Sequence, residues 1–127
     1  MSHPDFISGH WTGFFNHHAG GHRHPIDLVL SFSEDLIAGQ GEDELGAYGV
    51  AGCFEGASTE MTWTKTYFGG ESIRYRGYSE GAGIWGTWEI PGKSKGGFHI
   101  WPGIQNVTPA MLQQRHCVTA GGGKLSR

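Results

Sequence analysis

Residues 60–90 carry the clearest alternation of hydrophobic and polar positions in the chain. In the first of its three runs, Trp63 and Tyr67 alternate with threonines, and Lys65 falls on the same face as these aromatic side chains. The other two runs alternate in the same way, and glycine-containing stretches separate all three. A period of two with β-branched and aromatic residues is typical of half-buried strands. The segment therefore predicts three strands joined as antiparallel hairpins.

Shorter alternating runs on either side extend this pattern to eight strands. The five outside the central segment are residues 9–16, 26–32, 36–40, 45–54 and 97–102. Hairpins between neighbouring strands favour an up-and-down meander, and closing that meander removes the exposed sheet edges. The predicted fold is all-β: an eight-stranded antiparallel barrel over residues 1–103. A two-sheet sandwich of the same strands is the alternative.

The period of two also assigns one face of each strand to the interior. The predicted inward residues are Trp11, Leu28, Leu30, Phe32, Tyr48, Val50, Met61, Trp63, Tyr67, Ile73, Tyr75, Ile84, Trp88, Phe98 and Ile100. Turns centred on the glycine-rich stretches would place Lys65 opposite Tyr75, and Trp63 opposite Gly77. They would also place Tyr75 opposite Gly86.

Residues 104–127 form a tail of different character. Thr108 followed by Pro109 is typical of a helix start, so residues 110–115 are expected to form a short C-terminal helix. The three glycines at 121–123 would end any regular structure.

Composition narrows the class of protein. The chain has 127 residues, enough for one domain, with 23 glycines, 17% charged residues and a net charge of −3. This balance suits a tightly turning all-β protein and does not suggest a nucleic-acid partner. No apolar run is long enough to span a membrane, and the first residues lack the pattern of a signal peptide. A cytoplasmic protein with Cys53 and Cys117 as free thiols is therefore expected.

Gly9, His10 and Trp11 open the first predicted strand of this meander. A Gly-x-Trp triplet at that position resembles the calycin superfamily of lipocalins, fatty-acid-binding proteins and avidins. The resemblance implies that Trp11 plugs one end of the barrel. Size and strand count are most similar to avidin-like barrels, which hold a small ligand among several tryptophans. Gly13 stands where the avidins have a strand-one asparagine, so no set of ligand-binding residues carries over.

A histidine-rich loop is the first candidate for chemistry. It contains His17, His18, His22 and His24. Neutral imidazole is a good ligand for zinc, nickel or copper, so the loop is a candidate metal site. The Gly20–Gly21 pair favours the alternative, a flexible polar surface loop that binds metal adventitiously. No cofactor is predicted.

Lys65 is the second candidate, because the period of two turns it inward. An isolated buried ammonium costs on the order of several kcal/mol, so something must offset it. In one interpretation, Lys65 reaches the barrel mouth or bonds tyrosine hydroxyls or a carboxylate such as Glu60 or Glu89. In the other, it pairs with the anionic group of a small, partly aromatic ligand. The residues expected to hold that ligand are Lys65, Tyr48, Trp63, Tyr67, Tyr75 and Trp88.

Three functions are compatible with these features. A small-molecule binding protein leads, because eight-stranded barrels enclose side chains or one small ligand. A structural or interaction module would have a filled barrel instead. An enzyme acting at the barrel mouth would need a nucleophile or a carboxylate pair, and no catalytic residue is predicted. Outward-facing Trp85 and Trp101, expected opposite each other, predict a homodimer through that face.

Overall fold

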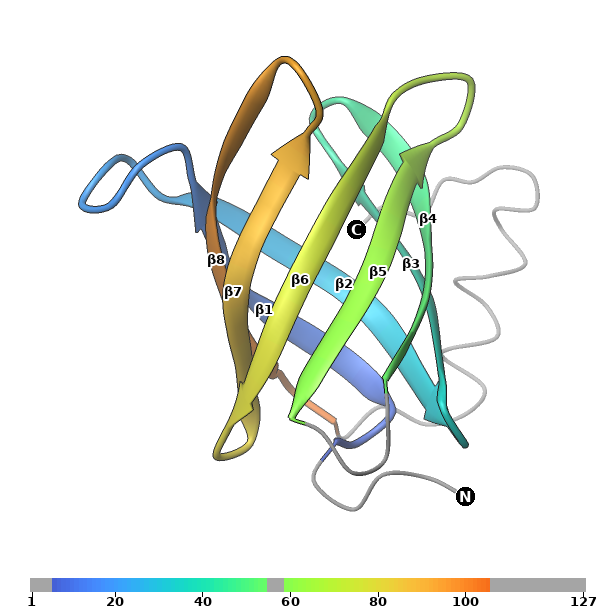
Figure 1. Cartoon of the computed structure of the whole chain (residues 1–127). Helices are drawn as coiled ribbons and strands as arrows, with labels where there is room; N and C mark the ends of the chain where they lie inside the picture. The colour runs from blue at the N-terminus through green and yellow to red at the C-terminus, as the bar shows by residue number, and fades with distance from the viewer. Residues whose placement is uncertain (1–5, 55–58, 106–127) are drawn as a thin grey trace.

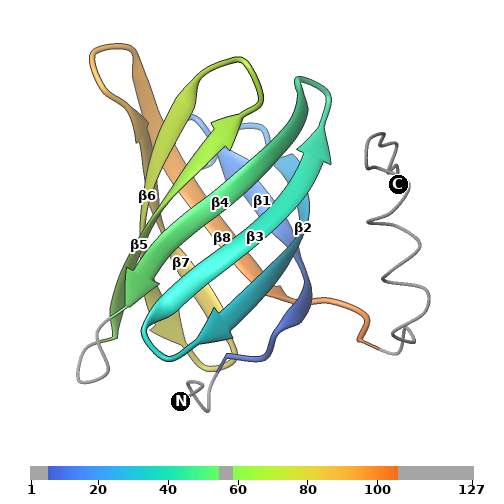
Figure 2. The same cartoon turned by 90° about the vertical axis from the view of Figure 1, so that its right-hand side faces the viewer.

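The structure, a computed structural model, describes residues 6–54 and 59–105. All eight predicted strands are present and pair in chain order as one closed antiparallel barrel (Figure 1, Figure 2). They are β1 (Gly9–Asn16), β2 (His24–Ser33), β3 (Leu36–Asp43), β4 (Gly46–Phe54), β5 (Glu60–Tyr67), β6 (Ser72–Glu80), β7 (Gly83–Ile90) and β8 (Ser94–Pro102). Because β1 pairs with β8, the barrel is confirmed and the sandwich is excluded.

The tail predictions lie outside the described residues. They are the helix at 110–115 and the thiol of Cys117. Cys53 is an exposed free thiol. No helix in the described ranges is long and apolar enough to cross a membrane.

The core follows the predicted inward face. Every predicted inward residue is buried, and three further hydrophobic residues join the core: Phe6, Ile37 and Phe54. Ile37 and Phe54 continue the alternation of β3 and β4. Phe6 precedes β1, so no strand alternation predicts its burial. It is buried because the segment before β1 passes over one end of the barrel.

Aromatic rings pack together at the end of the barrel where the chain enters β1, which is the lower end in Figure 1. The Phe6 ring stacks on Phe32 at 5.2 Å, and it lies 6.4 Å from the fully buried Trp11. The Trp11 indole N–H donates to the Ile7 carbonyl at 2.9 Å, and the Ser8 hydroxyl accepts the Phe32 N–H at 3.0 Å. Trp11 therefore occupies the end-plug position that the resemblance implied.

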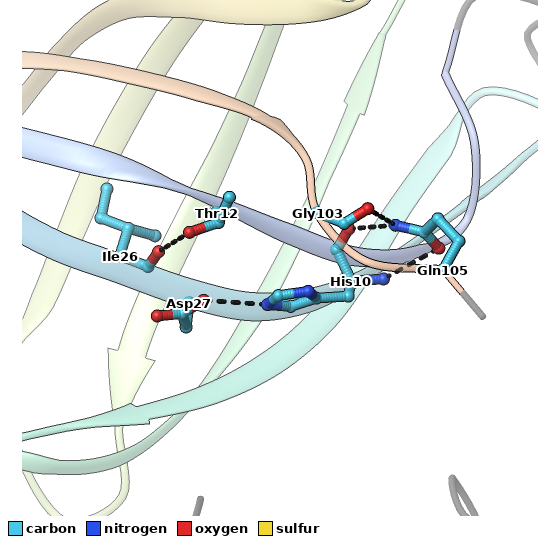
Figure 3. Close-up of polar contacts among 6 residues, drawn as sticks. All are labelled: His10, Thr12, Ile26, Asp27, Gly103 and Gln105. Atoms are coloured by element: carbon cyan, nitrogen blue, oxygen red, sulfur yellow. Dashed lines mark hydrogen bonds and ion pairs between the residues drawn. The ribbon is translucent and has the colours of Figure 1, made fainter. Parts of the chain in front are cut away.

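Side-chain contacts reinforce β1 at this lower end, where the chain leaves β8 (Figure 3). The Gln105 amide accepts the His10 backbone N–H at 3.3 Å and donates to the His10 carbonyl. The Gly103 N–H donates to that carbonyl at 2.8 Å. The His10 ring lies 2.8 Å from Asp27 on β2. These contacts tie β1 both to β2 and to the segment that follows β8.

The predicted cross-strand partners are wrong by two residues in three hairpins. Lys65 faces Ile73, Trp63 faces Tyr75, and Tyr75 faces Trp88. Trp85 lies opposite His99 rather than Trp101.

Turn chemistry explains this shift. The β5–β6 turn begins at Phe68 with Gly69 at φ 76°, and the β6–β7 turn has Gly81 at φ 61°. The centre of each turn lies one residue from the predicted centre, so each pairing moves by two positions. Because two is a whole period of a strand, the inward and outward faces are unchanged.

Candidate functional site

An ion pair lies inside the barrel towards the upper end, where the turns after β1, β3, β5 and β7 gather (Figure 1). The Lys65 ammonium is 3.2 Å from Asp43 Oδ2, and the Tyr67 hydroxyl donates to the same oxygen at 2.6 Å. Asp43 Oδ1 accepts the Leu45 N–H at 2.9 Å, which anchors the β3–β4 turn. The side chain of Lys65 is 8% exposed and that of Asp43 25%. Asp43 is thus the partner nearer to solvent.

Asp43 reaches this position because β3 is longer than predicted. The sequence prediction ended this strand at residue 40, which is wrong, because β3 runs to Asp43. Ile37, Gly39, Gly41 and Asp43 lie on one face of β3, so the strand's alternation turns the carboxylate inward. The run of glycines hid this face from a search for hydrophobic residues.

Asp43 replaces the carboxylates that the sequence suggested for Lys65. Glu60 pairs with Arg76 at 2.9 Å on the outside of the barrel. Glu89 is exposed on the outer face of β7, opposite Arg74 and Lys95. The interpretation that Lys65 meets an internal carboxylate and tyrosines therefore stands, with a different carboxylate.

Tyrosine rings enclose the ammonium. Lys65 Nζ lies 4.2 Å from the centre of the Tyr48 ring and 4.9 Å from that of Tyr67, within the range of cation–π attraction. The Tyr48 ring occupies space that a side chain at Gly41 would need: a Cβ there would lie 2.5 Å from the Tyr48 hydroxyl. The glycine on β3 therefore makes room for the ring that covers Lys65.

Burial shifts the acid–base chemistry of this cluster. Desolvation lowers the pKa of Lys65, and the nearby Asp43 charge opposes that shift. Desolvation raises the pKa of Tyr48 and of Tyr75, with Tyr75 and Asp43 adding to the shift at Tyr48. It also raises the pKa of Tyr67, whose hydrogen bond to Asp43 adds to the effect. The tyrosines therefore stay neutral well above the pH at which a free tyrosine ionises.

Stacked aromatic rings lie beside this cluster. Trp63 and Tyr75 stack at 5.4 Å with their planes 13° apart, and Phe98 meets both edge-on. Trp88 packs edge-on against Phe15 at 6.0 Å. All five of the aromatic residues expected around a ligand thus face inward and are buried: Tyr48, Trp63, Tyr67, Tyr75 and Trp88.

Three polar groups on the inward aromatic side chains make no hydrogen bond in the part of the chain that the structure describes. They are the hydroxyls of Tyr48 and Tyr75 and the indole N–H of Trp63. Among the same residues, no polar side-chain atom that is sealed from solvent lacks a partner. Each of the three therefore keeps some contact with solvent. By contrast, the indole N–H of Trp88 donates to the Asn16 carbonyl at 3.0 Å.

The histidine loop contributes rings to the same end of the barrel. His24 stacks on Phe15 at 4.8 Å, and His17 meets the Trp88 ring at 5.3 Å. His22 lies 4.7 Å from His24, while His18 is exposed. Within residues 6–54 and 59–105, no three His, Cys, Asp or Glu side chains are grouped to hold a metal ion. The contacts of His17, His22 and His24 are ring packing, while the His18 ring lies 3.3 Å from the Ala19 carbonyl. Metal binding stays a prediction.

A groove of about 470 Å³ lies on the outside of the barrel over β4 to β7. Its outward lining is polar, with Thr62, Arg74, Arg76 and Glu89. Arg76 is held by Glu60. This outer face therefore carries both arginine and glutamate side chains.

Comparison with known proteins adds no assignment. A scan against family models and searches of curated proteins and of solved structures found no match to this chain. Of the resemblance seen in the sequence, the structure supports only the architecture, an eight-stranded antiparallel closed barrel.

Proposed function

We propose that the protein binds a small, partly aromatic molecule at the upper end of the barrel. The observation that carries this proposal is a set of inward polar groups that make no hydrogen bond within residues 6–54 and 59–105: the Tyr48 and Tyr75 hydroxyls and the Trp63 indole N–H. Ligand sites are typically apolar and aromatic, with a few convergent polar groups that fix orientation. The calycin-like triplet Gly9, His10 and Trp11, with Trp11 buried at the lower end, also favours ligand binding.

The ion pair narrows the chemistry of this ligand. The interpretation with an anionic ligand requires an unpaired Lys65, but Asp43 already lies 3.2 Å from the ammonium and neutralises it. Asp43 is also the more exposed partner, so an incoming carboxylate would meet like charge first. The proposed ligand is therefore a neutral phenol or benzyl alcohol, whose hydroxyl bonds the uncommitted tyrosines and whose ring packs on Trp63.

A panel of small phenols led by 4-hydroxybenzyl alcohol should raise the melting temperature of the wild type. Saturation at a hundred times Kd corresponds to about 2.7 kcal/mol of added stability. Tyr75→Phe and Tyr48→Phe each remove a ligand hydrogen bond worth about 0.5–1.5 kcal/mol, so each should weaken binding about two- to tenfold. Thermal shift and calorimetry measure both effects.

Tyr78→Phe is the matched control, because this ring packs against Trp85 on the outer face. Its affinity should equal that of the wild type. If the wild type gains no stability from any member of the panel, the filled-barrel module is the better account. If 4-hydroxybenzoate binds more tightly than the neutral phenols, and Lys65→Met loses that binding, the ligand is anionic and pairs with Lys65. Turnover of a bound compound would indicate the enzyme alternative.

For assembly, we propose a homodimer through an outer aromatic row, defined as Phe14, His99, Trp85 and Tyr78 with the adjoining Trp101. The first four lie in register across β1, β8, β7 and β6. Trp85 is 47% exposed and Trp101 39%. In a two-fold dimer, the same surface of each subunit meets its own copy. Two aromatic rows can pack against each other, whereas two copies of the charged face over β4 to β7 would bring like charges together. The row is therefore the better dimer surface.

Trp85→Lys should convert the dimer to a monomer in multi-angle light scattering, because it puts two like charges into the contact. Thr64→Lys is the control, since Thr64 lies on the charged outer face. A wild type that is monomeric at high concentration would overturn the proposed dimer.

A further inference from the structure

We propose that Lys65 forms an imine with a small aromatic aldehyde bound at the upper end of the barrel. This inference rests on the proposed function, because it names the reactive class of ligand that the same site would take. The geometry places an amine and its carboxylate partner on the same inward face as a pair of stacked aromatic rings.

Lys65 has the surroundings that amine chemistry needs. Its side chain is 8% exposed, and its Nζ lies over the rings of both Tyr48 and Tyr67, so little water hydrates the ammonium. Lysines desolvated in this way act as nucleophiles towards carbonyl groups. The direction of the Lys65 pKa, lowered by burial, increases the fraction of free amine. Lys93, 67% exposed and paired with Glu71, has none of this enclosure.

Asp43 is placed to move the proton. In the proposed step it accepts a proton from the Lys65 ammonium, 3.2 Å away. The free amine attacks the aldehyde carbon and, after proton transfer within the adduct, forms a carbinolamine. Asp43 then returns its proton to the carbinolamine hydroxyl, the C–O bond breaks, and water leaves. The product is a protonated imine with Asp43 as its counter-ion, and no oxidant or reductant takes part.

The ligand's ring would lie against groups that are still uncommitted. The Trp63 and Tyr75 rings stack at the next inward positions along β5 and β6 from Lys65 and Ile73. The Tyr48 and Tyr75 hydroxyls make no hydrogen bond within the described residues. A phenolic hydroxyl on the aldehyde could bond either tyrosine. We therefore choose 4-hydroxybenzaldehyde as the probe.

The test is reductive trapping on the full chain. Wild type is incubated with 4-hydroxybenzaldehyde and sodium cyanoborohydride, and peptide mass spectrometry locates the added hydroxybenzyl group. Label at Lys65 should exceed label at Lys93 by about tenfold, because the bound carbonyl reacts at a high effective concentration. Lys65→Arg keeps the charge beside Asp43 and should lose that label, while Lys93→Arg should keep it.

Equal labelling of Lys65 and Lys93, or none at Lys65, would overturn the imine proposal. Peptide mass spectrometry of the labelled wild type gives this comparison even if Lys65→Arg fails to fold. 4-Hydroxybenzyl alcohol, which cannot form an imine, separates the two claims. If the alcohol stabilises the protein while Lys65 stays unlabelled, the imine is wrong and the binding function stands. If the alcohol gives no stabilisation and Lys65 stays unlabelled, both fail for this ligand class.

Discussion

Asp43→Asn is expected to destabilise the protein by about 3–5 kcal/mol at neutral pH, because it leaves the buried Lys65 ammonium without its counter-charge. Asparagine keeps the size of the side chain and can still accept the Leu45 N–H, so the loss reports on charge. The penalty should shrink as pH rises, because a stranded Lys65 escapes it by losing its proton. Urea unfolding at pH 7 and pH 9 measures both effects.

The reverse substitution should cost less. Lys65→Met leaves Asp43 25% exposed and still bonded by Tyr67 and Leu45, so water and these donors can support the carboxylate. The double variant should therefore be about as stable as Lys65→Met alone. Glu71→Gln, which breaks the exposed pair with Lys93, is the surface control and should cost about 0–1 kcal/mol. An Asp43→Asn penalty no larger than this control would contradict the account of the ion pair.

Stability should fall steeply as pH rises above 10, the value at which a free tyrosine ionises. Burial raises the pKa of Tyr48, Tyr67 and Tyr75 above it, so the unfolded chain loses protons that the folded chain keeps. The free energy of unfolding then decreases with pH by about 1.4 kcal/mol per pH unit for each tyrosine, or about 4 for all three. Lys65 acts in the opposite direction, because burial lowers its pKa in the folded chain: it makes stability rise with pH only between that lowered pKa and 10.5.

Denaturant unfolding between pH 9 and pH 12 gives this slope directly. Tyr75→Phe removes one of the three groups and should reduce the slope by about 1.4 kcal/mol per pH unit. Tyrosinate absorbance recorded in parallel should rise together with the loss of circular dichroism. Ionisation of all the tyrosines near pH 10 in a chain that stays folded would show that the inward hydroxyls are hydrated and not buried.

Much of the fold could be predicted from the sequence, because an error of two residues in strand pairing does not change which side chains face inward. Trp63, Lys65 and Tyr67 face inward whichever residue lies opposite them, since a turn that shifts the pairing by two leaves the faces unchanged. The cross-strand partners themselves depended on the turn tips. Whether a turn begins at Phe68 or at Gly69 depends on backbone geometry that composition does not specify.

The site was predictable in part, and Asp43 marks the limit. Lys65 stood out because it interrupts an aromatic face, and its aromatic neighbours follow from the same alternation. Its partner did not stand out, because the inward positions before Asp43 on β3 are Gly39 and Gly41, which give no hydrophobic signal. Phe6 was missed for a different reason: it precedes β1, so only the chain path shows that it seals the lower end.

The most direct test of ligand binding at the upper end is a titration followed through the indole N–H signals of the five tryptophans. In a nitrogen–proton correlation spectrum, 4-hydroxybenzyl alcohol should shift the Trp63 signal, because that N–H makes no hydrogen bond among the described residues and lies beside the proposed ligand. Trp11 at the lower end, and Trp85 and Trp101 on the outside, should stay unchanged. Shifts confined to Trp85 and Trp101, with Trp63 unmoved at saturation, would contradict a ligand inside the barrel.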